Sequence, residues 1–262
     1  MKKFILMALV LLNGCASFSK DGGFGVVEQT SQQRIGKEVK WVKSAADRSL
    51  VETRVAELLK NPLGVEDAVQ VALLNNQGLQ AAFADLGIAE ADFVQAGRLP
   101  NPGFSIGRLT RGSELEIERG VHLNLISLLM MPFKSEMEQR RFQSVQNEVA
   151  VSALKLASQT RKAYFSAVAA DEGVRYMNQV KQAADASAEL ARRMAQTGNW
   201  NKLNQAREQG FYADAVLNLA RAEQMQTASR EQLTRLMGLW GEQVKFALPE
   251  RLPDLPKSVD DL

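Results

Sequence analysis

Cysteine and histidine are almost absent from this 262-residue sequence: Cys15 is its one cysteine and His122 its one histidine. A single cysteine cannot form a disulfide within the chain or build a cluster of thiolate ligands. His122 has no second histidine and no nearby cysteine with which to complete a zinc site, so we interpret it as a polar strand residue. No group of residues suggests acid–base or nucleophilic catalysis. The sequence therefore predicts that the protein is not an enzyme and uses no cofactor or metal.

The sequence also lacks a strong charge of either sign and a long apolar run. Its 32 lysines and arginines nearly balance its 30 aspartates and glutamates, and no basic cluster points to nucleic acid. After the N-terminal segment, no apolar stretch reaches the roughly 18 residues of a membrane-spanning helix. If the chain crosses a membrane, strands must make the crossing.

The N-terminus has the pattern of a bacterial secretion signal. Lys2 and Lys3 precede the apolar run Phe4–Leu12, which is too short to span a bilayer but typical of a signal peptide. Leu12-Asn13-Gly14-Cys15 follows and resembles the lipobox of bacterial lipoproteins, in which the cysteine is acylated, for example with palmitate. We predict a signal peptide at residues 1–14 and lipidation of Cys15. An ordinary cleaved signal with a chance cysteine is the alternative.

The residues after Cys15 indicate where the anchored chain lies. Ala16 stands where an aspartate would suggest inner-membrane retention, so the outer membrane is favoured. Residues 15–44 are rich in glycine and polar side chains, and we predict that they form a lipidated tether.

Proline is absent between Pro132 and Pro249, and helix-compatible residues fill much of this interval. Apolar and small residues recur at three- and four-residue steps, as in coiled coils. The patterns predict a short helix at about 45–60 and long helices at about 66–98, 132–196 and 202–239. The middle helix would be roughly 95 Å long, and the other two long helices could stack end to end beside it. A simple antiparallel coiled coil is the alternative.

Between these helices the pattern changes to strict alternation, which predicts strands at about 103–111 and 114–126 joined by a turn at Gly112-Ser113. If Arg111 pairs with Glu114, Phe104 faces Val121. One face of this hairpin is mostly apolar and the other is polar, as in a strand pair that spans an outer membrane. A soluble hairpin with one buried face is the alternative.

The alternation assigns residues to the two faces of the hairpin. The residues predicted to face lipid are Phe104, Ile106, Leu115, Ile117, Val121, Leu123 and Leu125. The polar residues predicted to face an aqueous lumen are Glu114, Glu116, Glu118 and Asn124. The glutamates are spaced two residues apart on one face, which favours a solvated lumen that attracts cations over an acid–base pair. Two arginines on the apolar face could extend toward lipid phosphates.

The break between the last two long helices is a second candidate site. Gly198 permits a tight turn there, and Trp200 is an aromatic candidate for a contact with another protein. As the turn farthest from the hairpin, Gly198, Asn199 and Trp200 are predicted to face a periplasmic adaptor. The alternative is a plain turn with Trp200 packed locally.

Three stretches in this order resemble the outer-membrane efflux protein (TolC-like) family. They are Leu73-Leu74-Asn75-Asn76, Gln95-Ala96-Gly97-Arg98-Leu99-Pro100-Asn101-Pro102 and Arg230-Glu231-Gln232-Leu233-Thr234-Arg235-Leu236-Met237-Gly238-Leu239. The resemblance runs from about Leu50 to Pro256, and with Cys15 it suggests a lipoprotein member. It implies a mainly α fold with long, antiparallel, coiled-coil-like tunnel helices and one amphipathic transmembrane β-hairpin.

The resemblance also implies a function and partners. Family members have two such repeats, form trimers, and dock on a periplasmic adaptor (membrane fusion) protein and an inner-membrane pump. Residues 45–262 match one repeat, so we expect half of a TolC-like subunit. The expected function is a passive conduit of a tripartite export system, lipid-anchored in the cell outer membrane with its helices in the periplasm. A non-conducting periplasmic coiled-coil lipoprotein that binds partners is the alternative. The exported substrate could be a drug, a metal or a protein.

Overall fold

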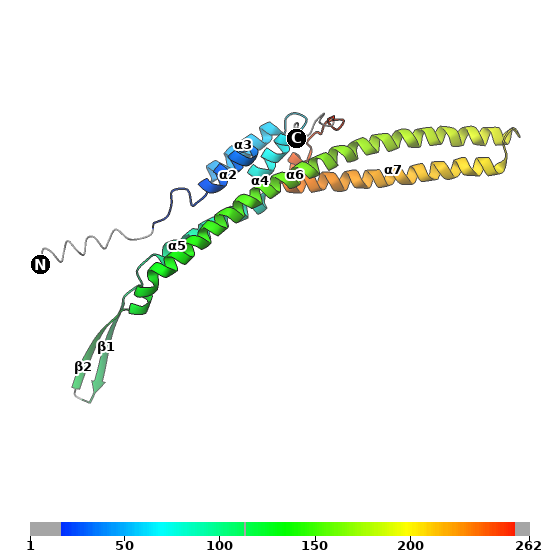
Figure 1. The fold of residues 1–262 in the computed structure, drawn as a ribbon. Coiled ribbons are helices and arrows are strands. Elements are labelled where there is room, and N and C mark those ends of the chain that lie inside the picture. Colours follow the sequence, from blue (N-terminus) through cyan, green and yellow to red (C-terminus); the bar gives the residue numbers. More distant parts are fainter. Residues whose placement is uncertain (1–16, 113, 255–262) are drawn as a thin grey trace. The chain divides into compact units, whose positions relative to one another are not determined.

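The computed structural model describes residues 17–112 and 114–254, with the backbone alone described for Arg111 and Glu114. Helices dominate, and the only sheet in this part of the chain is an antiparallel pair of strands (Figure 1). The predicted fold class is confirmed at this level. The elements are α2 (Gly25–Ile35), α3 (Ala45–Leu58), α4 (Val65–Asn75), α5 (Gln77–Ala96), β1 (Gly103–Arg111), β2 (Glu114–His122), α6 (Leu125–Gln196), α7 (Lys202–Met237) and the 3-10 helix η2 (Gly241–Val244).

The chain divides into two compact units. The first comprises the described residues up to Gln33 together with Ala81–Ser152, and the second comprises Arg34–Gln80 and the described residues from Ala153 onward. The long helix α6, with 72 residues and a contour length of about 108 Å, contributes to both. No helix in the described ranges is both long enough and apolar enough to cross a membrane.

The core of the first unit is built from aromatic and aliphatic side chains of α5 and α6 and of the segment before α2. The rings of Phe24 and Phe83 meet edge to face at 4.9 Å, and those of Phe93 and Phe142 stack at 6.3 Å. Leu86 is fully buried beside them in α5. Aromatic pairs in these geometries add stability beyond the area that they bury.

The predicted tether at 15–44 is wrong as a description of its described part. This part contains α2, its residues up to Gln33 belong to the first unit, and its residues from Arg34 belong to the second unit. The Ser19 N–H donates to the Glu90 carboxylate at 2.6 Å, and Gln146 Nε2 donates to the Gly23 carbonyl at 3.0 Å. Gly23 has a φ of +74°, and a Cβ on it would collide with the Phe142 ring. Composition alone suggested a flexible linker, whereas a few specific contacts fix the segment.

The second unit is held together where α4 meets the end of α7. Asn75 Nδ2 donates to the carbonyls of Met237 at 3.2 Å and Gly238 at 2.7 Å. Gly238 ends α7 with a φ of +66°, and a Cβ on it would lie 2.5 Å from the Asn75 carbonyl oxygen. The fully buried Leu233 and Met237 pack in the same region. Glycine is therefore required here both for backbone conformation and for space.

The expected helix at about 66–98 is interrupted in the structure. Asn76 has an extended backbone (ψ of 117°) that separates α4 from α5. Its Oδ1 accepts the Leu79 N–H at 2.9 Å, as an N-cap does, and its Nδ2 donates to the Leu236 carbonyl at 2.9 Å. The apolar periodicity continues through this position, which is why the sequence pattern predicted one helix.

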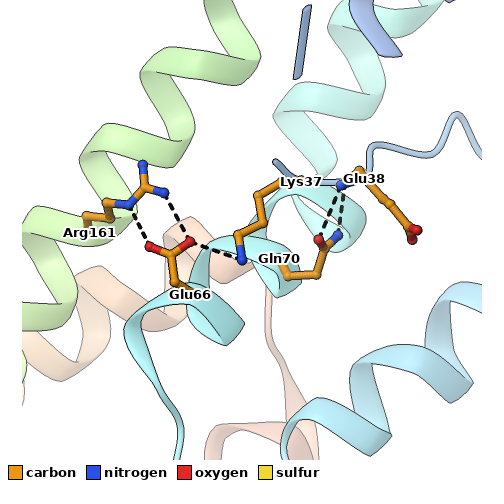
Figure 2. A network of polar contacts seen from close by, with 5 residues as sticks. All are labelled: Lys37, Glu38, Glu66, Gln70 and Arg161. Atoms are coloured by element: carbon orange, nitrogen blue, oxygen red, sulfur yellow. Dashed lines mark hydrogen bonds and ion pairs between the residues drawn. The ribbon is translucent and has the colours of Figure 1, made fainter. Parts of the chain in front are cut away.

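A network of polar contacts joins three further segments of the second unit (Figure 2). Arg161 on α6 donates to both carboxylate oxygens of Glu66 at 3.1 Å, and Lys37 Nζ lies 3.0 Å from Glu66 Oε2. Beside it, the Gln70 amide exchanges two hydrogen bonds with the backbone of Glu38. The hydrogen bonds from Arg161 and then Lys37 hold the pKa of Glu66 below its ordinary value.

Candidate functional site: an exposed hairpin and a helix turn

The hairpin of β1 and β2 has the predicted register. Arg111 pairs with Glu114, Ile106 with Arg119 and Phe104 with Val121. Because side chains alternate along a strand, each pair of directly opposed residues lies on one face of the sheet. Phe104, Ile106, Leu115, Ile117 and Val121 therefore share a face with Arg108, Thr110 and Arg119.

The apolar face of the hairpin is uncovered. Phe104 is 75% exposed and Ile106 is 82% exposed, and the other three apolar residues of this face are more than half exposed. A soluble hairpin that buries this face against its own chain would shield these side chains, and within the described residues nothing does so. Aromatic and branched aliphatic side chains left in this state indicate a surface that contacts lipid or another protein.

The opposite face carries mostly polar and small residues, together with the exposed Leu109. Glu116 and Glu118 are exposed on this face, and Gly107 and Gly120 contribute no side chain to it. His122 Nε2 lies 3.2 Å from Ser105 Oγ. Glu114 belongs to the same face by register, although its side chain is not described. Among the described residues, no group of three or more histidine, cysteine, aspartate or glutamate side chains could hold a metal ion.

The predicted strand at 114–126 is too long, and the predicted start of the long helix at 132 is too late. β2 ends at His122 and α6 begins at Leu125. Asn124 is therefore not a strand residue on the polar face. Its Oδ1 accepts the Ser127 N–H at 2.9 Å, so it caps the helix. Leu123 precedes this cap and Leu125 belongs to α6, so neither belongs to the apolar face of the strands, although both are exposed.

The first turns of α6 carry an exposed apolar surface that the sequence patterns did not predict. Leu125, Leu129, Phe133 and Met137 are four residues apart and so lie on one side of the helix, with Ile126 and Met130 beside them. All six are exposed, and Phe133 is 68% exposed. We call these six residues the α6 apolar stripe. The run Leu125–Met131 was its sequence signal, and the period-two interpretation of this region concealed it.

The turn between α6 and α7 is tightly specified. Gly198 has a φ of +79°, and the N–H groups of Gly198 and Asn199 donate to the carbonyls of Ala195 and Met194, which closes a Schellman motif. Asn201 then caps α7 by accepting the Asn204 N–H at 2.8 Å. Trp200 is half-buried in this turn.

An ionic cluster lies near this turn on α6. Glu189 accepts hydrogen bonds from Arg192 and Arg193 at 2.8 to 2.9 Å. These donors, Arg192 first, lower the pKa of Glu189 to about 2. Glu189 therefore remains ionised at any physiological pH and keeps its pairing with the two arginines.

Helices α6 and α7 lie side by side and antiparallel in the second unit (Figure 1). Ser187 Oγ donates to Glu208 at 2.6 Å, and Gln226 Nε2 donates to Asp171 at 3.0 Å. Alanines fill much of the seam between them, which allows a close approach. Large apolar side chains remain exposed along the pair, namely Tyr176, Leu190, Leu203, Phe211, Leu217 and Met225.

The predicted lipidation residue Cys15 lies outside the described residues, and its acylation stays a prediction. The two-repeat organisation of the family likewise stays an expectation.

Comparison with known proteins identifies the fold. No family model and no curated protein matches the sequence. The chain is similar to a structure of CusC that concerns folding and transmembrane channel formation (TM-score 0.59, 18% identity, 76% of this chain and 47% of that chain). It is also similar to a membrane protein from Pseudomonas aeruginosa (TM-score 0.61, 18% identity, 76% and 50%).

A third similar structure is the CmeC outer membrane channel of Campylobacter jejuni (TM-score 0.63, 15% identity, 89% of this chain and 51% of that chain). The chain thus spans about half the length of each of these structures. Identities this low establish the fold alone. The protein shares its fold with these three structures.

Proposed function

We propose that this chain is a subunit of an outer-membrane efflux channel and acts as a passive conduit in a tripartite export system. The observation that supports this most is the uncovered apolar face of the hairpin, opposed by a face with exposed Glu116 and Glu118. A strand pair needs this division when lipid lies on one side and water on the other. The likeness to channel structures over 76–89% of the chain agrees with it.

The strand length is compatible with this role. Each strand has 9 residues, or about 30 Å at 3.3 Å per residue. If the strand is tilted by about 40° from the membrane normal, it covers about 23 Å along that normal. This is close to the apolar band of about 25 Å that membrane-spanning strands present in an outer membrane. The outer edges of β1 and β2 would need partner strands within lipid, because unpaired backbone groups are costly there. Further copies of this chain, or further sequence, would supply them.

The helices would extend the conduit into the periplasm. The exposed apolar side chains along α6 and α7 in the second unit favour neighbouring helices of other copies, in a homo-oligomer. The turn at Gly198, Asn199 and Trp200 would meet the periplasmic adaptor, which in turn engages the inner-membrane pump. Acylation of Cys15 would anchor the chain to the outer membrane.

The second candidate is a periplasmic coiled-coil lipoprotein that binds partners without conducting. The antiparallel pair of helices α6 and α7 suits this function equally well. The uncovered face of the β1–β2 hairpin favours the conduit, because it lies opposite a mostly polar face, as in strands that have lipid on one side and water on the other.

Conductance separates the two candidates. The purified full chain is added to planar lipid bilayers, and the conduit predicts discrete, cation-preferring current steps. Replacing Glu118 by lysine on the polar face should reduce the cation preference, because it reverses a lumen charge. The matched control is Thr110→Ser on the opposite face, which should leave the preference unchanged. Absence of current steps in bilayers that do take up the chain would favour the lipoprotein instead.

A further inference from the structure

The first unit contains a mixed-charge cavity of about 830 Å³ next to the hairpin. It is bounded by the end of α5, the segment that leads to β1 and the first turns of α6. Its charged lining residues are Arg98, Lys134, Arg141, Asp92 and Glu138. The volume falls within the range of about 300–1,000 Å³ that is typical of small-molecule sites.

The cations of this cavity are largely unpaired. Within the described residues, the side chains of Arg98 and Lys134 have no carboxylate partner and no hydrogen-bond acceptor. Arg141 Nη1 lies 3.6 Å from Glu138 Oε2, which is too far for a hydrogen bond. Two unpaired basic groups and a weakly paired third make a good environment for a phosphate.

The anions of the cavity are also incompletely satisfied. Glu138 Oε2 is buried and has no hydrogen-bond donor within the described residues. A buried carboxylate oxygen without a donor is costly, and a ligand that supplies an N–H group at this side chain would relieve that cost. Asp92 lines the same cavity. The site therefore suits a ligand that carries a phosphate and an ammonium group together.

The apolar side chains around the cavity indicate what the rest of the ligand is. Leu99 and Met137 line it and are about 60% exposed, and Met131 also lines it. Met137 also belongs to the α6 apolar stripe, which has no charged residue from Leu125 to Phe133 and leads back to the hairpin. Charged residues of α6 begin at Lys134, directly after Phe133 of the stripe. This order, apolar and then basic, matches the order of acyl chains and headgroups at a membrane interface.

From these observations we infer that the cavity binds the phosphoethanolamine headgroup of a membrane phospholipid, with the acyl chains along the α6 apolar stripe. The phosphate contacts Arg98 and Lys134, and the ammonium group donates to Glu138, whose side chain rotates toward it. The inference deepens the proposed function and rests on it, because it requires that the hairpin enters lipid and brings α6 to the headgroups.

Lipid selectivity provides the test. The full chain in detergent is titrated with dihexanoyl phosphatidylethanolamine, dihexanoyl phosphatidylcholine and inorganic phosphate, and binding is measured by microscale thermophoresis. Choline cannot donate a hydrogen bond, so the ethanolamine lipid should bind about tenfold more tightly than the choline lipid. Equal binding of the two lipids would overturn the inference. If inorganic phosphate binds as tightly as the ethanolamine lipid, the cavity is a site for a free anion, and this result would also overturn the inference.

Variants assign the roles within the cavity. Glu138→Gln should abolish the preference for the ethanolamine lipid over the choline lipid. The double variant Arg98→Gln with Lys134→Gln should weaken the binding of both lipids by about 25-fold, or about fivefold for each cation. Arg140→Gln is the matched control, because Arg140 is paired with Glu136, is highly exposed and does not line the cavity. A preference that survives in Glu138→Gln would contradict the assignment.

The proposed function is tested separately in the same chain. Hairpin insertion is followed by quenching of a tryptophan placed at Ile106 by brominated lipid. Insertion without ethanolamine selectivity rejects the headgroup site alone. Lack of insertion rejects the proposed function, whatever the lipid titration gives.

Discussion

Replacing Gly238 by alanine should destabilise the second unit strongly. Gly238 has a φ of +66°, where an L residue costs about 1 kcal/mol. The added Cβ would also lie 2.5 Å from the Asn75 carbonyl oxygen and 3.1 Å from Asn76 Cα, and both of these atoms belong to the backbone. The end of α7 must therefore move away from α4.

That movement would break the contacts between the two helices. Asn75 Nδ2 donates to the carbonyls of Met237 and Gly238, and Asn76 Nδ2 donates to the Leu236 carbonyl. Loss of these three hydrogen bonds costs about 3 kcal/mol, so the total for Gly238→Ala, with the backbone strain, is about 4 kcal/mol.

Gly241 provides a matched control. It has a φ of +58°, but no atom lies within 4 Å of an added Cβ. Gly241→Ala should thus cost about 1 kcal/mol from backbone strain alone. The assay is urea unfolding of both variants and the parent chain, followed by far-UV circular dichroism. If the two variants are destabilised equally, to within about 0.5 kcal/mol, the close approach of α4 and α7 does not contribute as we describe.

Three further changes have expected outcomes. Asn76→Ala should cost about 2 kcal/mol in the same urea assay, because it removes the N-cap of α5 and a hydrogen bond to α7; an unchanged midpoint would contradict this. The pKa of Glu66 in the folded protein lies below its ordinary value of 4.5. The ion pairs of Glu66 therefore stabilise the folded state fully above pH 4.5, and this stabilisation is lost as the pH falls through the lower folded-state pKa. Glu66→Gln should therefore cost about 0.5–1 kcal/mol at pH 7 and progressively less below pH 4.5, and a pH-independent difference would refute it. Trp200→Ala should weaken crosslinking of the turn to a periplasmic adaptor, whereas unchanged crosslinking would leave Trp200 a local packing residue.

Local patterns were sufficient to predict the strands and their pairing. The alternation from Gly103 to His122 and the short turn at Gly112 predict one register. It puts every large apolar residue except Leu109 on one face, and the structure has this register. The proline-free interval likewise led to long helices, because no residue in it forbids α-helix and the seam residues recur at helical spacing.

Contacts between distant residues could not be predicted in this way. The break at Asn76 depends on the Leu236 carbonyl, and the packing of the segment before α2 depends on Glu90, Phe142 and Gln146. The start of α6 was missed because Leu123-Asn124-Leu125 continues the alternation of β2, while the capping role of Asn124 is visible only in its bond to the Ser127 N–H.

The candidate membrane surface was therefore only half predicted. The apolar face of the strands followed from the sequence, but the α6 apolar stripe and the cavity beside it did not. Both depend on where α6 begins and on its packing against α5 in the first unit.

In the proposed conduit, one face of the hairpin lies against lipid and the other against water. The most direct measurement places a single tryptophan in turn at Phe104, Ser105, Ile106 and Gly107, in full chains whose own tryptophans are replaced by phenylalanine. The variants are reconstituted in vesicles, and quenching by brominated lipid and by aqueous iodide is compared. We expect brominated lipid to quench positions 104 and 106 and iodide to quench positions 105 and 107. Quenching of all four positions by iodide alone would mean that neither face of the hairpin lies against lipid.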